Sequence, residues 1–467
     1  MNLHLAILLI YAAALMGIGL WIGRRVRGAS DFFVAGRRLG PLLLGSTMLA
    51  ANIGAGSTVA AAGLGYADGL SAWWWVGSAG IGSIVLALWI GPRMRRIAAR
   101  HGHRTLGDYL EYRFGREVRA TIALLLWFGT LALLAVQLIA IGWVLNVVVG
   151  LDRWVGCLIG GVVVTAYFAA GGLLTAAWVN VVQLAVLLAG FAVALPLALG
   201  AAGGWETVWA ATSAIDGYWS PWQGGASGWF YLVMLGPAFI VSPGLVQKIY
   251  GARDDRTVRI GVGVNALVLL AFASVPPLLG MIARTTHPAL PEQALALPTL
   301  LMDTLPPVVG ALGLAALFSA EVSSSDAILF MLATSLSQDL YRRFVHPEAD
   351  ERRMLTVARL AAVAGGALGT VIAIVAVSIE TVLAVFYTLL TVSLFVPILA
   401  GLYTRRVGSP EALGAIAGGV SLFIVAQVAG GGARIAGWTP AMIGLAGAAV
   451  TALLVLAVRR PPRPESG

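Results

Sequence analysis

The sequence predicts an all-α membrane protein that crosses the bilayer with 13 helices. Of its 467 residues, 59% are hydrophobic, 11% are charged and 58 are glycine, a composition that excludes an ordinary soluble domain. The apolar runs are continuous for about twenty residues or more, the length that a helix needs to cross a bilayer. Strands of a membrane barrel would instead give segments of about ten residues with alternating polarity. We therefore expect a polytopic helical bundle.

Hydropathy and turn residues divide the chain into thirteen apolar runs. The first run has no basic segment before it and is too long for a signal-peptide core, so we expect it to be retained as a helix. The single cysteine, Cys157, lies inside an apolar run, which excludes a disulfide framework. The runs cover residues 3–23, 41–67, 71–92, 117–148, 154–170, 172–200, 228–250, 257–284, 307–341, 354–378, 380–403, 410–430 and 438–458.

The basic residues predict how the chain is oriented in the membrane. Of the 30 basic residues, 27 lie in alternate loops, and the exceptions are Arg153, Arg284 and Arg434. Because cytoplasmic loops are enriched in Lys and Arg, we expect a multi-pass protein of the cell membrane with its N-terminus outside and its C-terminus inside. The net charge of +9 is carried by these short loops and not by a basic domain, so no nucleic-acid partner is expected.

The second apolar run is interrupted at its centre. Residues 49–58 contain Asn52, Gly54, Gly56 and Ser57, which favour a broken helix at membrane depth. Non-helical backbone at that depth is tolerated where it lines a cavity. Ser57 or Thr58 can cap the outer half-helix, and the freed carbonyls near the break suit a small cation. Close helix packing through small residues explains the same pattern equally well.

A second interrupted run lies at residues 235–244, which contain Pro237 and Pro243. Each interrupted run is followed by four further apolar runs, which gives two groups of five. Since five is an odd number, the second group of five starts from the opposite face of the membrane, so an internal repeat would be inverted. Paired interrupted segments at matching positions of two halves are a signature of a secondary-transporter site.

The ninth run carries polar residues in an apolar helix. Ala320, Ser323 and Ser324 lie on one helical face. Together with the carbonyls of Ala50 and Ile53 they can form a five-oxygen sodium cage. Two carboxyl residues, Glu321 and Asp326, lie in the same run and are functional hypotheses because ionisable groups are costly in a membrane. Hydrogen bonding between helices is the alternative interpretation of the same residues.

Five segments in order resemble the sodium/solute symporter family of proline, pantothenate, sugar and carboxylate transporters. They are residues 31–41, 50–53, 243–250, 323–326 and 337–341. The resemblance implies the leucine-transporter fold, with one helix before and two after an inverted repeat of five helices. It divides a single transmembrane domain, 1–467, into a first helix and loop (1–40), two repeats (41–200 and 228–403) and two C-terminal helices (410–458).

The resemblance also implies positions for the bound ion and solute. The shared sodium site of the family falls on the carbonyls of Ala50, Ile53 and Ala320 and on the hydroxyls of Ser323 and Ser324. Sodium is then the coupling ion, and no organic cofactor is expected. The solute is expected between the two breaks, near Gly54, Gly56, Ser57, Leu235, Phe239 and Tyr387.

The chain departs from the family pattern at three places. Many members have an aspartate, associated with a second sodium ion, where this chain has Asn180, so we expect one sodium ion. Glu321 replaces a residue that is usually apolar. Members that transport sugars tend to have an acidic residue and an amide just after the first break, where this chain has Gly56 and Ser57. That difference favours a carboxylate-bearing solute over a sugar.

The sequence therefore predicts a sodium-coupled symporter of a small organic solute, such as an amino acid, a monocarboxylate or a vitamin, that works by alternating access. Its expected partners are the solute, sodium and the lipid bilayer. The alternative is a proton-coupled transporter that uses Glu321 and Asp326. An enzyme is not expected, because no run carries His or Cys at ligand spacing. A membrane sensor is disfavoured because the chain ends at Gly467. The solute and the oligomeric state stay open.

Overall fold

The computed structural model describes residues 3–23, 39–376 and 378–459, and within them the regular secondary structure is helical apart from one short hairpin and two isolated β-bridges. Residues 31–38, part of a family-like segment, lie outside this range. The helices are α1 (Leu3–Gly23), α3 (Pro41–Asn52), α4 (Ala61–Asp68), α5 (Trp73–Val85), α6 (Gly91–His101), α7 (Leu106–Phe114), α8 (Arg116–Val149), α9 (Arg153–Ala201), α10 (Gly204–Thr212), α11 (Tyr231–Val241), α12 (Pro243–Tyr250), α13 (Asp255–Phe272), α14 (Val275–Thr286), α15 (Ala296–Thr299), α16 (Pro307–Thr334), α17 (Glu351–Val375), α18 (Ile379–Tyr403), α19 (Ser409–Ala429) and α20 (Pro440–Val458). Strands β1 (Gln223–Gly224) and β2 (Ser227–Gly228) pair antiparallel.

The predicted all-helical membrane architecture is confirmed, and ten helical segments of the described residues are long and apolar enough to cross a membrane. All thirteen predicted runs are helical over most of their length. The fifth and sixth runs, however, join in the single 49-residue helix α9. Gly171 and Gly172, where a turn was expected, lower helix propensity but do not by themselves end a helix.

The first predicted interruption is present in the structure. Helix α3 ends at Asn52, and Ile53 is extended, with φ −104° and ψ 96°. The helix resumes as a π-helical turn over Gly56–Ala60 and continues into α4. The extended residue turns the backbone away from helical pairing, so the carbonyls on the α3 side of the break are available to other groups.

The second interruption lies at Ser242, later in the predicted segment than its first proline. Pro237 is accommodated inside α11, whereas Ser242 (φ −51°, ψ 121°) separates α11 from α12, which begins at Pro243. A further break, between α13 and α14, was not predicted. It precedes Pro276 and Pro277, which lack the N–H that a continuous helix would need.

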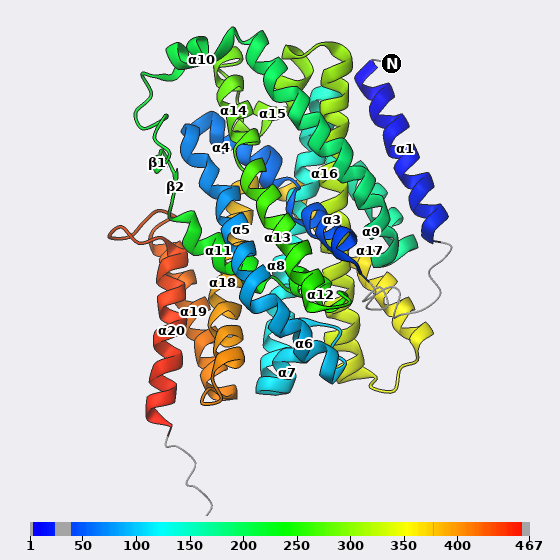
Figure 1. The fold of residues 1–467 in the computed structure, drawn as a ribbon, viewed down its shortest axis with the longest axis vertical. Helices are drawn as coiled ribbons and strands as arrows, with labels where there is room; N and C mark the ends of the chain where they lie inside the picture. The colour runs from blue at the N-terminus through cyan, green and yellow to red at the C-terminus, as the bar shows by residue number, and fades with distance from the viewer. Residues whose placement is uncertain (1–2, 24–38, 377, 460–467) are drawn as a thin grey trace, which may run out of the picture.

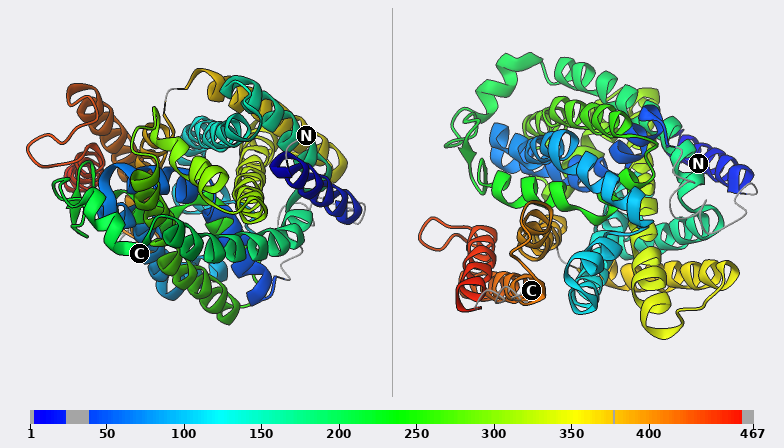
Figure 2. Two further views of the ribbon diagram at one scale, coloured as in Figure 1. Left: turned by 90° about the horizontal axis from the view of Figure 1, so that it is seen from above. Right: turned by 60° about the horizontal axis from the view of Figure 1, so that its bottom comes forward.

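Helix α16 is the buried centre of the bundle and packs against α1, α3, α8, α9 and α17. Helices α19 and α20 pair at one edge of the molecule, and α1 lies at the opposite edge (Figures 1 and 2). Helix α1 begins at the end of the bundle that carries α10, whereas α20 ends toward the end that carries α6 and α7 (Figure 1). These are called the α10 end and the α6/α7 end below.

Candidate functional site

The five oxygens predicted for a cation lie together where α3 ends against α16. The Ser324 Oγ lies 3.0 Å from the Ala50 carbonyl oxygen and 3.1 Å from that of Ile53. The Ser323 Oγ lies 3.3 Å from the Ala50 carbonyl oxygen and 3.1 Å from that of Ala320. All five residues are buried. The structure therefore brings one turn of α16 against the open end of α3.

The cluster has fewer hydroxyl hydrogens than close oxygen–oxygen pairs, which fits a site for a cation. Each serine hydroxyl has a single hydrogen to donate, yet the Oγ atoms of Ser323 and Ser324 each lie within 3.3 Å of two carbonyl oxygens. At each serine, one of the two close oxygen pairs therefore has no hydrogen between its atoms. The ligand set is three carbonyls and two hydroxyls, which are hard and neutral oxygen donors of the type that binds hard cations.

Glycine at position 54 is required by the close approach of α16 and α8. A Cβ atom on Gly54 would lie 2.2 Å from Ser324 Oγ and 2.7 Å from Gln137 Oε1.

The predicted cap at the start of the outer half-helix is wrong in detail. Ser57 Oγ accepts a hydrogen bond from the N–H of Gly54, before the π-helical turn. The N–H of Ala55 instead donates to Gln137 Oε1 at 2.8 Å.

A pocket lies between the two interruptions, and we call it the central cavity. Aromatic side chains form much of one wall. The ring centroids of Phe239 and Tyr387 are 5.5 Å apart, and Trp75 lies 6.5 Å from Tyr387 and donates its indole N–H to the carbonyl of Gly56. All six residues predicted to contact the solute line this one cavity: Gly54, Gly56, Ser57, Leu235, Phe239 and Tyr387.

A second lobe adjoins the central cavity on the side of α12. The two share Asn52, Phe239 and Tyr387 among their lining residues. Lys248 also lines this lobe and is 3% exposed. From the sequence we assigned Lys248 to a basic loop, and the structure corrects that assignment because α12 carries its side chain into the bundle.

Two further polar residues near the cavity, Gln137 and Asn265, were not singled out from the sequence. Gln137 of α8 lines the cavity beside the cage. Asn52 donates to Asn265 of α13 at 2.9 Å. Gln137 and Asn265 each stand among apolar residues of a membrane run, and a lone polar residue in such a run is a signal that could have identified them.

The two carboxyl residues of α16 lie outside the lining of both lobes. Glu321 is fully buried, and its Oε1 lies 2.9 Å from the Thr58 hydroxyl at the first break. Asp326 is also buried, and neither of its carboxyl oxygens has a hydrogen-bond partner among the residues that the structure describes. The side chain of Asn180 lies outside the described part of the structure, so the one-sodium expectation that depends on it stays a prediction.

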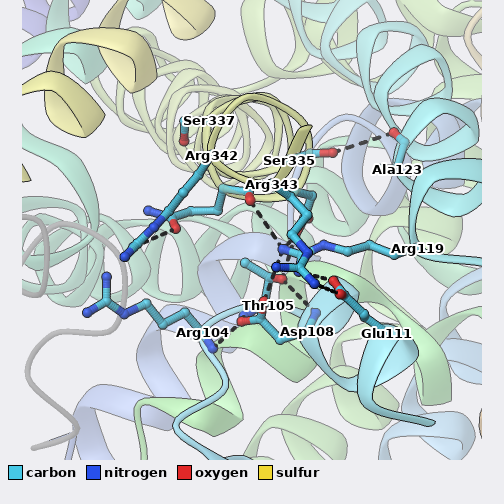
Figure 3. Close-up of polar contacts among 12 residues, drawn as sticks. Arg104, Thr105, Asp108, Glu111, Arg119, Ala123, Ser335, Ser337, Arg342 and Arg343 are labelled. Carbon is cyan, nitrogen blue, oxygen red and sulfur yellow. Dashed lines mark hydrogen bonds and ion pairs between the residues drawn. The ribbon is translucent and has the colours of Figure 1, made fainter. Parts of the chain in front are cut away.

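An ion-pair cluster joins α7 and α8 to the π-helical segment Ser335–Val345 that follows α16 (Figure 3). Arg119 pairs with Asp339 at 2.7 Å and with Glu111 at 2.8 Å, and Arg343 also pairs with Glu111. Thr105 donates to Asp339 at 2.6 Å. Partial burial opposes ionisation of Glu111, but hydrogen bonds and charges from Arg119 and Arg343 outweigh it and lower the pKa of Glu111.

An interrupted membrane helix beside a buried oxygen cluster and a central cavity is the arrangement of an ion-coupled secondary transporter. Known structures support the fold. A Na⁺-coupled sialic acid symporter in a substrate-bound outward-open state superposes with a TM-score of 0.81 over 99% of each chain, at 18% identity. The nucleobase-cation-symport-1 family transporter Mhp1 gives 0.60 over 92% of this chain and 94% of its own, at 14% identity.

The family follows from the sequence match. The model of the sodium:solute symporter family matches residues 32–421, so the chain belongs to that family, as the resemblance predicted. Proteins of this family are transporters and not enzymes, and they use sodium as the coupling ion without an organic cofactor.

Among curated relatives, the sodium/pantothenate symporter of Escherichia coli is 28% identical over 450 residues, which cover 90% of each chain. The human sodium/iodide cotransporter is 27% identical over 438 residues, and the match covers 87% of this chain and 66% of the relative.

Proposed function

We propose that this protein is a sodium-coupled symporter of a small organic solute that carries a carboxylate, and that it works by alternating access. Sodium binds the carbonyls of Ala50, Ile53 and Ala320 and the hydroxyls of Ser323 and Ser324. The solute binds in the central cavity between the two interrupted helices. We further propose thirteen crossings with an inverted five-helix repeat, an outside N-terminus and a single sodium ion.

The observation that carries this proposal is the position of Ser324. Its hydroxyl lies within 3.1 Å of two cage carbonyls, and the same residue lines the central cavity. Ordering the cage therefore also orders a wall of the solute site. Such a shared residue is a physical means by which one ligand can favour the binding of the other.

The solute class is inferred from the cavity lining and from related proteins. Gly54, Gly56 and Ser57 bring backbone and one hydroxyl to the cavity, where a sugar transporter of this family would tend to present an acidic residue and an amide. The aromatic wall of Trp75, Phe239 and Tyr387 suits a compact apolar body. Related proteins are named for pantothenate and for sialic acid, and both of these solutes are acids.

The experiment begins with a thermal-shift screen of the purified protein against amino acids, monocarboxylates, vitamins and sugars, with and without sodium. Solutes that raise Tm then enter uptake assays in proteoliposomes with separate sodium and proton gradients. We expect uptake to follow the sodium gradient and to continue when the proton gradient is collapsed. Uptake that ignores sodium would overturn the proposal.

A proton-coupled transporter is the second candidate, and the geometry of Glu321 favours it. The Thr58 hydroxyl lies 2.8 Å from the Gly54 carbonyl oxygen and 2.9 Å from Glu321 Oε1. It has one hydrogen, so both contacts are hydrogen bonds only when Glu321 carries a proton. In this alternative, protonation of Glu321, with Asp326 a turn further along α16, replaces sodium binding. Uptake driven by a proton gradient in sodium-free buffer would support it.

A further inference from the structure

Lys248 is the single lysine of this chain, which has arginine at its other 29 basic positions. Helix α12 begins directly after the second interruption and places Lys248 on its last turn. Although the residue is close in sequence to the basic loop that follows α12, it is buried, with 3% of its surface exposed. The sole ammonium group of the side chains thus lies inside the bundle.

Among the residues that the structure describes, no carboxylate pairs with this ammonium. No hydrogen bond or ion pair joins the Lys248 side chain to any residue in the described parts of the chain, and its carbonyl accepts only from backbone N–H groups. The acidic residues nearest in sequence are Asp254 and Asp255, and they pair with arginines. Removing a charge from water without a partner costs several kcal/mol. A buried ammonium that lines a cavity and has no charged partner among the described residues therefore indicates a binding site, and the ligand that it would bind is an anion.

The second lobe borders Lys248 directly. Lys248 lines the second lobe together with Ser242 and Gly244, at the start of α12. The positive end of the α12 dipole therefore points toward the same lobe. Asn52 and Tyr387 line both this lobe and the central cavity, so the lobe beside the ammonium adjoins the proposed solute site.

We propose that the Lys248 ammonium binds the carboxylate of the transported solute in this lobe, on the α6/α7 side of the central cavity. This inference rests on the proposed function and narrows it, because the solute must then carry a negative charge. It also gives the two interruptions different tasks. The first provides neutral oxygens to a cation, and the second provides a cation to an anion.

The single lysine makes a direct measurement possible. Lysine labelled with ¹³C at Cε, supplied during expression, gives one resonance in the full-length purified protein. The Lys248→Arg variant, which lacks that resonance, identifies it. The probes are four carboxylates and their neutral amides at constant sodium: propionate and propionamide, lactate and lactamide, benzoate and benzamide, nicotinate and nicotinamide. We expect at least one carboxylate, and not its amide, to shift the resonance saturably.

Two variants separate binding from folding. Lys248→Met, which removes the charge at similar length, should weaken the carboxylate-induced rise in Tm about tenfold or more in apparent Kd, and Lys248→Arg should retain most of it. Arg259→Met, which removes an exposed positive charge from α13, should have no effect on it. Sodium alone should raise Tm equally in all three variants. A loss of the sodium effect in the wild type would instead refute the proposed function.

Three results would overturn the Lys248 proposal. The first is a resonance that ignores all four carboxylates, and the second is one that shifts equally with each carboxylate and its amide. The third is a resonance that responds to chloride when chloride replaces sulfate at constant sodium, but to no carboxylate. That result would assign the site to an inorganic anion.

Discussion

The two interrupted helices of this protein break in the same way and present opposite chemistry. At the first break the extended Ile53 exposes carbonyl oxygens that face the serine hydroxyls of α16. At the second, Ser242 and Pro243 start a new helix that carries a buried lysine into the bundle. A broken helix provides free carbonyls on one side of the break and free N–H groups on the other. The surrounding side chains decide which of these the site uses.

The largest effect is expected when the hydroxyls of the first break are removed. Replacing both Ser323 and Ser324 by alanine takes away two of the five proposed sodium ligands, and the sodium-induced rise in Tm and sodium-driven uptake should fall to background. The matched control is Ser325→Ala, whose hydroxyl bonds the Glu321 carbonyl of its own helix at 2.8 Å. Normal sodium dependence in the double variant would show that the cage is elsewhere.

Gly54→Ala tests the close approach at the same break. The added Cβ would lie 2.2 Å from Ser324 Oγ, so the two segments must separate, at a cost of about 1–3 kcal/mol in stability. We expect a lower Tm and a severalfold weaker apparent sodium affinity. Gly263→Ala is the control, since a Cβ at Gly263 would have no neighbour within 4 Å. Equal behaviour of the two variants would mean that α16 does not pack tightly against the break.

Glu321→Gln separates the two candidate coupling ions. The amide keeps the shape of the carboxyl and can still contact the Thr58 hydroxyl, but it cannot release a proton. For sodium coupling, sodium-driven uptake should stay within about threefold of the wild type. For proton coupling, proton-driven uptake should disappear. Uptake as a function of sodium and of pH, measured separately in each variant, distinguishes these outcomes.

The smallest effect is expected at the ion-pair cluster, whose Arg119 and Asp339 line a cavity with Pro243 of the second break. A carboxyl with a lowered pKa stabilises the folded protein above its unfolded pKa, and that stability is lost as pH falls through the folded pKa. Glu111→Gln should therefore cost about 1 kcal/mol at pH 7 and progressively less below about pH 4. Thermal unfolding as a function of pH measures this difference.

The control for the cluster is Glu117→Gln. Glu117 is exposed on the first turn of α8 and forms no ion pair with the described residues. A pH-independent difference between Glu111→Gln and the wild type would mean that the charge of Glu111 contributes nothing to stability.

Local patterns indicated that these five oxygens lie close together, because the patterns themselves determine much of that geometry. The i, i+3 and i+4 spacing places Ala320, Ser323 and Ser324 on one face of any helix. The glycines mark where the facing helix must open. A comparable signal existed for Gln137, a polar residue isolated in an apolar run, and we did not use it.

Lys248 and the length of α9 could not be predicted in this way. Whether a basic residue at the end of a run faces water or a cavity depends on how α12 packs against α3 and α6, and the local sequence does not encode that packing. Whether the helix continues through Gly171 and Gly172 likewise depends on neighbouring helices, because glycine weakens a helix without ending it.

Because Ser324 belongs both to the proposed sodium cage and to the wall of the central cavity, the two binding equilibria obey a reciprocal relation. If bound sodium raises the affinity for the solute by a given factor, the bound solute must raise the affinity for sodium by the same factor. A solute that fills the cavity without tightening sodium binding would be held without being coupled. The sodium affinity measured with each bound compound therefore ranks compounds as substrates or as blockers before any uptake is measured.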